Sequence, residues 1–230
     1  MKVDPKQNHA IITGDFIGFS DLPVEVRQGM YFILKKCGVA LSEIFPGIMP
    51  YEVDVFRGDG CQILLTDPVF SLRAALYFRA YIKAHSPEKN SEQKIDSRLA
   101  IGVGSIDYVP DRRVSAGDGP AFRVSGKMIE QMISPKSGTM RFAMSGFDEA
   151  LLLDGIVRMT GALADHWTDK QSLAMTGALQ KWTRKQIGGL WKDAVSPQAV
   201  GKHLERANWY AVDHGLRVFE GAMSKLFNPW

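Results

Sequence analysis

The sequence predicts an α+β protein in which a sheet domain, residues 1–145, is followed by a region of helices only, residues 146–230. In the first part, β-branched runs alternate with stretches whose apolar residues recur at helical spacing. In the second part only the helical spacing remains. The charge also changes: of 28 basic and 25 acidic residues, 9 and 6 lie in residues 165–230, so the whole basic excess lies there.

The first part is expected to hold eight elements in the order β-α-β-β-α-β-α-β. The strands are expected at residues 9–16, 51–57, 61–66, 97–106 and 139–145, and the helices at 23–45, 68–85 and 121–133. The "GDG" between the second and third strands is a tight-turn signal, so these strands form a hairpin. The first six elements match the ferredoxin-like split βαβ arrangement, with helices packed on the sheet.

The second part is expected to hold helices at residues 147–167, 168–182, 183–191, 196–210 and 209–230. Thr168 is a suitable N-cap for the second of them. Ser196 as N-cap and Pro197 at the first helical position give the fourth a strong start signal. Val200 and Leu204 face inward from it, which is typical of a helix-turn-helix, here at about residues 168–210.

The composition is that of a globular protein, with 230 residues, 45% hydrophobic and 23% charged. The sequence contains no run of 18 apolar residues, so no membrane span is predicted. The first ten residues, "MKVDPKQNHA", lack the apolar core of a secretory signal. Cys37 and Cys61 form neither a disulfide framework nor a metal motif, and are interpreted as buried thiols in a reducing compartment. We therefore expect a cytoplasmic protein without a membrane partner.

Two aspartates stand out because each follows a strand-like segment. Asp15 ends the first strand and Asp59 lies at the tip of the hairpin. In the predicted sheet these strands are neighbours, so the carboxylates meet at one end and repel each other unless a cation intervenes. Such oxygen ligands suit Mg²⁺ or Mn²⁺ held together with nucleotide phosphates. The alternative is two unrelated turn aspartates, because Asp-Gly is common in hairpins.

Four stretches resemble the motifs of class III nucleotide cyclases. "GDFIGFSDL" is similar to their first metal motif and "VFRGDGCQILL" to their second, while "SRLAIGVGSI" and "GDGPAFRVSGKM" resemble the strand and helix of the third. The order and spacing agree across about residues 8–135. The stretches "ITGDF", "GDGCQ" and "SAGDGPA" also resemble the SatD family of bacterial proteins, which add a C-terminal helix-turn-helix.

The resemblance implies a palm-like sheet, often dimeric, that binds a nucleoside triphosphate with Mg²⁺ or Mn²⁺. Asp15 and Asp59 carry over as the metal pair. The residues assigned to the nucleotide are Gly14, Phe16, Gly18, Phe19, Gly58 and Asp118. The glycines allow backbone to approach phosphate closely. Asp118 has an equally good interpretation as an Asx turn before Pro120.

The sequence departs from the cyclase pattern at its catalytic positions. No purine-selecting Lys precedes Asp59, where the stretch reads "DVFR". The expected Asn and Arg of the third-motif helix are also missing, and Arg123 or Lys127 are the positions that would replace them. Taken on its own, each of these two residues is more often a surface charge than a catalytic group. Metal and triphosphate binding is therefore better supported than efficient cyclisation.

The basic excess of the C-terminal region points to double-stranded DNA. The residues assigned to DNA are Arg184, Lys185, Ser196, Gln198, Lys202 and Arg206. Gln198 would meet base edges, while Ser196 and Lys202 reach phosphates. The alternative is a small helical bundle used for oligomerisation. The sequence thus favours a nucleotide-responsive regulator, expected as a homodimer; the alternatives are an active metal-dependent cyclase or nucleotidyltransferase, and an interaction scaffold without metals.

Overall fold

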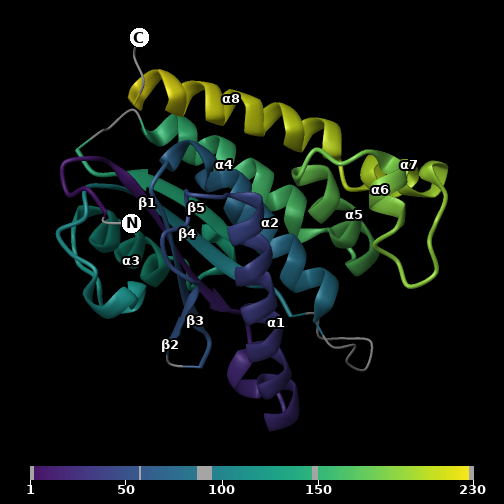
Figure 1. Ribbon diagram of the computed structural model, residues 1–230, viewed down its shortest axis with the longest axis horizontal. Helices are drawn as coiled ribbons and strands as arrows, with labels where there is room; N and C mark the ends of the chain where they lie inside the picture. The colour runs from purple at the N-terminus through teal and green to yellow at the C-terminus, as the bar shows by residue number, and fades with distance from the viewer. Residues whose placement is uncertain (1–2, 57, 87–94, 147–149, 228–230) are drawn as a thin grey trace.

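The computed structural model describes residues 3–56, 58–86, 95–146 and 150–227, and its centre is a five-stranded sheet (Figure 1). The strand order is β2-β3-β1-β4-β5. β1 is antiparallel to both β3 and β4, and β5 is parallel to β4. The strands are β1 (His9–Phe16), β2 (Asp54–Phe56), β3 (Gly60–Leu65), β4 (Ser97–Gly104) and β5 (Met140–Met144).

Eight α-helices accompany this sheet in the described residues. They are α1 (Val24–Ile44), α2 (Ser71–His85), α3 (Pro120–Gln131), α4 (Ala150–Asp165), α5 (Asp169–Leu179), α6 (Arg184–Gly188), α7 (Pro197–Arg206) and α8 (Trp209–Phe227). The order of strands and helices along the chain is confirmed. None of these helices combines the length and apolar character that a membrane crossing requires.

Several predicted boundaries are wrong. The helices expected at 168–182 and 196–210 end at Leu179 and Arg206, and the strand expected at 97–106 ends at Gly104. The strand expected at 51–57 is β2 alone, three residues long, with residue 57 outside the described part. The helix expected from residue 68 begins with a 3₁₀ turn, Pro68–Phe70, because Asp67 caps Val69. The helix expected at 183–191 ends at Gly188. Residues 147–149 and 228–230 of the predicted helices also lie outside the description.

The sheet has one apolar face and one mixed face. Ala10, Ile12 and Phe16 of β1 belong to the main core with residues of α1 and α2. Because strand side chains alternate, Thr13 and Asp15 point to the other face, where α3 packs on β1, β4 and β5 (Figure 1). The polar side chains of the first motif are thereby kept out of the main core.

Gly102 sets how closely α3 approaches β4. A Cβ atom there would lie 2.5 Å from the carbonyl oxygen of Ala121 and 2.6 Å from the backbone nitrogen of Ser125. Only a residue without a side chain allows this contact between helix and sheet backbones. The approach also brings Ser125 Oγ to 2.9 Å from Thr13 Oγ1.

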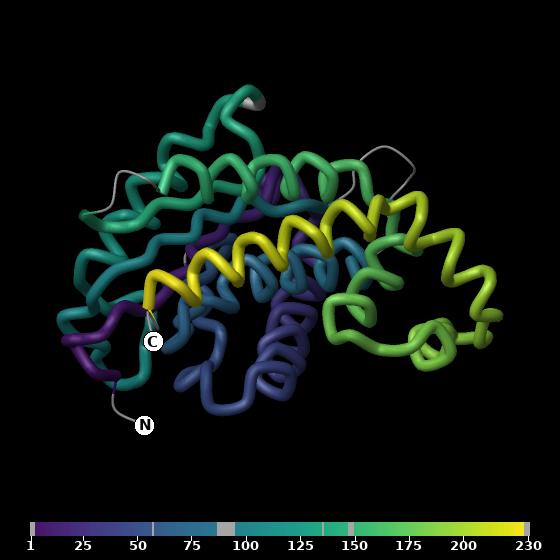
Figure 2. Tube along the Cα trace, turned by 90° about the horizontal axis from the view of Figure 1, so that it is seen from above, coloured from purple at the N-terminus to yellow at the C-terminus, as the bar shows by residue number. Residues whose placement is uncertain are grey.

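The C-terminal helices share the main apolar core with the sheet domain. The ring of Phe219 in α8 packs edge-on against Phe142 of β5, with centroids 5.3 Å apart. Figure 2 shows α8 running along α4, back from the far end of the molecule. α3 and the α6–α7 pair lie at opposite ends of the molecule in both views.

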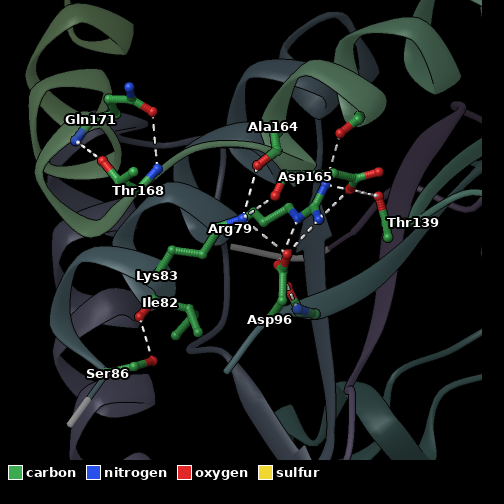
Figure 3. A network of polar contacts seen from close by, with 12 residues as sticks. Arg79, Ile82, Lys83, Ser86, Asp96, Thr139, Ala164, Asp165, Thr168 and Gln171 are labelled. Carbon is green, nitrogen blue, oxygen red and sulfur yellow. Dashed lines mark hydrogen bonds and ion pairs between the residues drawn. The ribbon is translucent and has the colours of Figure 1, made fainter. Parts of the chain in front are cut away.

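A buried charge network joins α2 to β4 and to the end of α4 (Figure 3). Arg79 has a side chain with no exposed surface and donates to Asp96 at 2.8 and 2.7 Å and to Asp165 at 2.6 Å. Its remaining donors reach Thr139 Oγ1 and the Gly161 carbonyl. The network therefore pins the C-terminal end of α4, which leads into α5, to the sheet domain.

Lys83 completes the network one helical turn after Arg79. Its ammonium donates to Asp96 at 3.0 Å and to the last carbonyls of α4, at Ala164 and Asp165. Burial raises the pKa of Asp96, but the hydrogen bonds and charges of Arg79 and Lys83 outweigh burial and leave it below its ordinary value. Both cations thus hold this aspartate in its charged form.

Candidate functional site

A pocket of about 530 Å³ opens on the mixed face of the sheet, beside the C-terminal half of α3. β1, the β2–β3 hairpin and β4 form its floor, and α3 forms one wall. The polar side chains that line it are Thr13, Asp15, Asp59, Gln62, Arg98, Ser115 and Glu130. Its volume lies in the range of small-molecule and cofactor sites.

Asp15 and Asp59 line this one pocket, as the sequence predicts for the pair. In the register of β1 with β3, Asp15 lies opposite Gly60, the residue that follows Asp59. Two strand ends therefore bring together carboxylates that are far apart in the sequence. Gly60 lies under the ring of Phe56, where an added Cβ atom would come within 2.7 Å of it. This packing fixes the hairpin beside Asp59.

Arg98 is a cation that the sequence motifs did not reveal. It lies opposite Asp15 in the register of β1 with β4. Its guanidinium donates Nε to Oδ1 at 2.9 Å and Nη2 to Oδ2 at 2.5 Å, and it donates Nη1 to the carbonyl oxygen of Met132 at 2.9 Å. The side chains of Arg98 and Asp15 are only 24% and 27% exposed. The proposed metal ligand therefore already has a bidentate partner.

Gln62 and Thr13 form the polar floor next to the carboxylates. Gln62 donates Nε2 to Thr13 Oγ1 at 3.2 Å. Its Oε1 atom is buried and has no hydrogen-bond partner in the part of the chain that the structure describes. Burying an acceptor without a hydrogen bond destabilises the folded chain, unless a bound molecule supplies a donor. A hydroxyl or amino group of a ligand is such a donor.

The other predicted nucleotide-binding residues divide into three groups. Gly14 lines the pocket. Phe16 and Phe19 are 3% and 9% exposed and stack on each other in the main core, so they support the strand end and do not face the pocket. Gly18 and Gly58 are exposed and have φ values of 67° and 90°, where glycine is favoured, but neither lines the pocket.

The two predicted catalytic residues and Asp118 lie outside the pocket. Arg123, with a side chain 57% exposed, pairs with Asp118 at 2.8 Å and with Asp107 at 3.5 Å. Asp118 also accepts from its neighbour Gly119 at 2.7 Å, so its oxygen is engaged in the loop itself. Lys127 is exposed on α3 and does not line the pocket. Within one chain, these groups do not meet Asp15 and Asp59.

Sequence reasoning missed Arg98, Gln62 and Glu130. The signal for Arg98 was available, because it is the one charged residue in the strand "SRLAIGVG". The partner of Arg98 could not be predicted, because it depends on which residue of β1 lies opposite Arg98 in the sheet. Glu130 follows Gly126 on α3 at a spacing of one helical turn, and both line the pocket.

The oxygen ligands at this pocket are of the kind that divalent cations bind, but the described residues do not form a complete metal site. Carboxylate oxygens are the ligands that Mg²⁺ and Mn²⁺ prefer. Among the residues that the structure describes, no three His, Cys, Asp or Glu side chains are grouped closely enough to hold a metal ion. Cys61, beside Gly14, adds no ligand, because burial together with the charge of Asp15 raises the pKa of its thiol to about 12. Ligand phosphates or water would have to complete the coordination.

The predicted DNA-binding residues lie on the surface of α6 and α7. Ser196 caps α7 through its hydroxyl at 3.2 Å from the Ala199 nitrogen, as expected. Gln198, Lys202 and Arg206 are exposed on α7, whereas Val200 and Leu204, as predicted, are buried. Arg184 and Lys185 are exposed at the start of α6.

A second hollow, of about 890 Å³, lies between the start of α6, α7 and the start of α8. Arg184, Gln198 and Lys202 line it, together with Trp182 and Tyr210. The Arg184 guanidinium lies over α7, and a Cβ atom on Gly201 would come within 3.2 Å of it. Basic, amide and aromatic groups therefore share one surface.

Comparison with known proteins gives similarity to nucleotide cyclases over part of the chain. No family model matches, and no curated protein matches. The guanylyl cyclase Cya2 is 15% identical over 57% of this chain and 73% of its own, with a TM-score of 0.40. A bacterial light-regulated adenylyl cyclase is 17% identical over 59% of this chain and 42% of its own, with a TM-score of 0.38.

A class III adenylyl cyclase-like ATP-binding protein from Pseudomonas aeruginosa is 10% identical over 95% of this chain, with a TM-score of 0.36. The chain spans 44% of the length of that protein. TM-scores of this size do not decide function, which is therefore inferred from the pocket and its residues.

Proposed function

We propose that this chain binds a nucleoside triphosphate together with Mg²⁺ or Mn²⁺ in the pocket at Asp15 and Asp59. It is, in this proposal, a class III cyclase-like palm of the SatD type, followed by a helix-turn-helix. The observation that carries the proposal is that both aspartates line one pocket, next to the Gln62 amide oxygen, which has no hydrogen-bond partner in the described part of the chain. The strand order β2-β3-β1-β4 supports the ferredoxin-like part of it.

The charges of the pocket explain why a metal is needed. Among the described lining residues, the carboxylates of Asp15, Asp59 and Glu130 face one guanidinium, that of Arg98. A polyphosphate would be repelled by this excess of negative charge. A divalent cation bound between the aspartates and the phosphates removes the repulsion, which is the role metals have in phosphoryl chemistry. Phosphate binding in this pocket is therefore expected to depend on the metal.

The first test is thermal unfolding with ATP, GTP, CTP and UTP, each with and without Mn²⁺. A ligand that binds only the folded chain raises the melting temperature, by about 5–10 °C at a hundredfold excess over its dissociation constant. We expect a rise that requires Mn²⁺ and is lost in both Asp15→Asn and Asp59→Asn. The nucleotide that raises the melting temperature most is identified as the preferred ligand.

Asp193→Asn is the matched control, because Asp193 is an exposed loop residue that lines neither hollow. It removes the same charge and should leave the rise unchanged. If no nucleotide raises the melting temperature of the wild type, the proposal is wrong and the sheet domain acts as a scaffold.

Binding is favoured over cyclisation for a single chain, because Arg123 and Lys127 do not reach the pocket. An active cyclase or nucleotidyltransferase would need a second copy of the chain to supply these groups, in the expected homodimer. Incubation of the stabilising nucleotide with Mn²⁺, followed by chromatography for a cyclic product, separates the two. A product that disappears in Asp59→Asn would assign the enzyme.

A second proposed function is binding of double-stranded DNA by α6 and α7. The exposed basic and amide side chains on α7, and the cap by Ser196, support it. Burial, followed by the charges of Lys170 and Arg206, lowers the pKa of the neighbouring His203. Such a basic surface attracts the negatively charged phosphate backbone of DNA.

We expect the double variant Lys202→Ala/Arg206→Ala to weaken binding to duplex DNA at low salt. Each lost phosphate contact reduces the slope of log affinity against log salt by about 1, so the double variant should lose about 2. Fluorescence anisotropy of a labelled duplex at several salt concentrations measures this. Arg158→Ala, on the exposed side of α4, is the control and should keep the wild-type slope. No affinity of the wild type for any duplex would exclude the function.

A further inference from the structure

The pair of Arg98 and Asp15 places a cation of the chain itself where a metal is expected. A guanidinium has five N–H donors, and here three are used, two by Asp15 and one by the Met132 carbonyl. The other two have no partner among the described residues. The side chains of Arg98 and Asp15 both line the pocket, so a ligand bound there lies beside this guanidinium.

We propose that Arg98 is the built-in counter-cation of Asp15, which a divalent metal must displace, and that the displaced guanidinium then binds the phosphate chain of the ligand. This inference rests on the proposed function, because it concerns the same metal and the same phosphates. It assigns Arg98 a role that the sequence motifs did not supply, as a binding residue for the polyphosphate.

The physical reason lies in competition for one carboxylate. Both oxygens of Asp15 accept from Arg98 in a bidentate, largely buried pair. A metal that binds Asp15 alone must break this pair and leave a guanidinium without its partner, which is costly. A phosphate chain that arrives with the metal offers the guanidinium a new bidentate partner. Metal and phosphate therefore favour each other's binding.

The position of Arg98 keeps it at the pocket after displacement. The Met132 carbonyl, just beyond α3, holds its Nη1 atom independently of Asp15. Because the residue lies within β4 and opposite Asp15, the side chain needs only to turn, without any movement of the strand. Glu130, nearby on α3, disfavours a free phosphate in this corner unless Arg98 or the metal balances its charge.

The test is binding of Mn²⁺ alone, measured by electron paramagnetic resonance, to the wild type and to Arg98→Met. Loss of a charge-assisted bidentate competitor should tighten Mn²⁺ binding by about tenfold. Arg217→Met is the matched control: Arg217 pairs with Asp213 on the surface of α8, and its loss changes the net charge equally. Its Mn²⁺ affinity should equal that of the wild type.

Equal or weaker Mn²⁺ binding in Arg98→Met than in the wild type would overturn the inference. Failure of the proposed function looks different, because the nucleotide-dependent rise in melting temperature would then be absent or would persist in Asp15→Asn and Asp59→Asn. If the rise in melting temperature depends on both aspartates but Arg98→Met binds Mn²⁺ as the wild type does, this inference is wrong and the proposed function stands.

A second measurement uses the wild type and does not depend on the folding of a variant. The Nε–H signal of Arg98 is followed by NMR during titration with Mg²⁺ and then with tripolyphosphate. We expect it to move only slightly with Mg²⁺ alone and to shift fully when both are present. A signal that stays unchanged with both present would show that the Arg98–Asp15 pair survives, and would overturn the inference.

Discussion

Arg79→Met is expected to lower the free energy of unfolding by about 3–5 kcal/mol, the usual cost of removing one partner of a buried ion pair. The guanidinium of Arg79 has no exposed surface and contacts both Asp96 and Asp165 (Figure 3). Its loss leaves Asp96, itself largely buried, with Lys83 as its only cation among the residues that the structure describes. Urea unfolding followed by circular dichroism measures the loss.

The same variant should change how stability depends on pH. The pKa of Asp96 is lower in the folded chain than its ordinary value, so its contribution is present above about pH 3.9 and is lost as the pH falls through the folded pKa. Arg79→Met removes most of that contribution. The difference in stability between wild type and variant should therefore stay constant down to about pH 4 and narrow as the pH falls below about 3.9.

Lys35→Met is the control for this prediction, because Lys35 and Glu52 form a surface pair with side chains 46% and 85% exposed. Such pairs contribute less than about 1 kcal/mol. A loss below about 1 kcal/mol in Arg79→Met itself would mean that the network does not hold α4 to the sheet domain.

Gly102→Ala should destabilise the protein by about 2–3 kcal/mol and weaken ligand binding in the pocket. The new methyl group would meet backbone atoms of α3 at 2.5 and 2.6 Å, which a flexible side chain cannot relieve by turning. α3 must therefore move outward, and it carries the pocket wall at Gly126 and Glu130. Urea unfolding and the nucleotide-dependent melting temperature report the two effects.

Gly155→Ala provides the comparison within a helix. A Cβ atom at Gly155 in α4 meets nothing within 4 Å. There alanine should stabilise the helix by about 0.5–1 kcal/mol, because glycine loses more backbone entropy on folding. If Gly102→Ala were as stable as wild type, the close contact between α3 and β4 would be refuted.

The sequence by itself determined the local elements. The β-branched runs at 9–16 and 61–66 and the helical spacing of 23–45 predict β1, β3 and α1 almost to the residue. Alternation and periodicity depend only on neighbours in the chain, so no tertiary information is needed. The start of α7 at Ser196 and Pro197 was predictable for the same reason, because a cap is a contact within one turn.

The placement of Asp15 and Asp59 in one pocket was also predicted, through the expected strand order. The roles of Phe16 and Phe19 were not predicted, because the sequence does not show which side of a strand end faces the core. The structure puts both rings in the main core and leaves Asp15 on the face of α3.

The partner of Asp15 was decided by the tertiary structure alone. Arg98 lies 83 positions along the chain, and it meets Asp15 only because β1 and β4 pair in one register. A shift of that register by one residue would turn the guanidinium to the opposite face of the sheet. The register follows from the packing of both faces at once, including the contact at Gly102. Whether Asp15 meets a metal or an arginine is therefore a property of the packed sheet, which no single stretch of sequence contains.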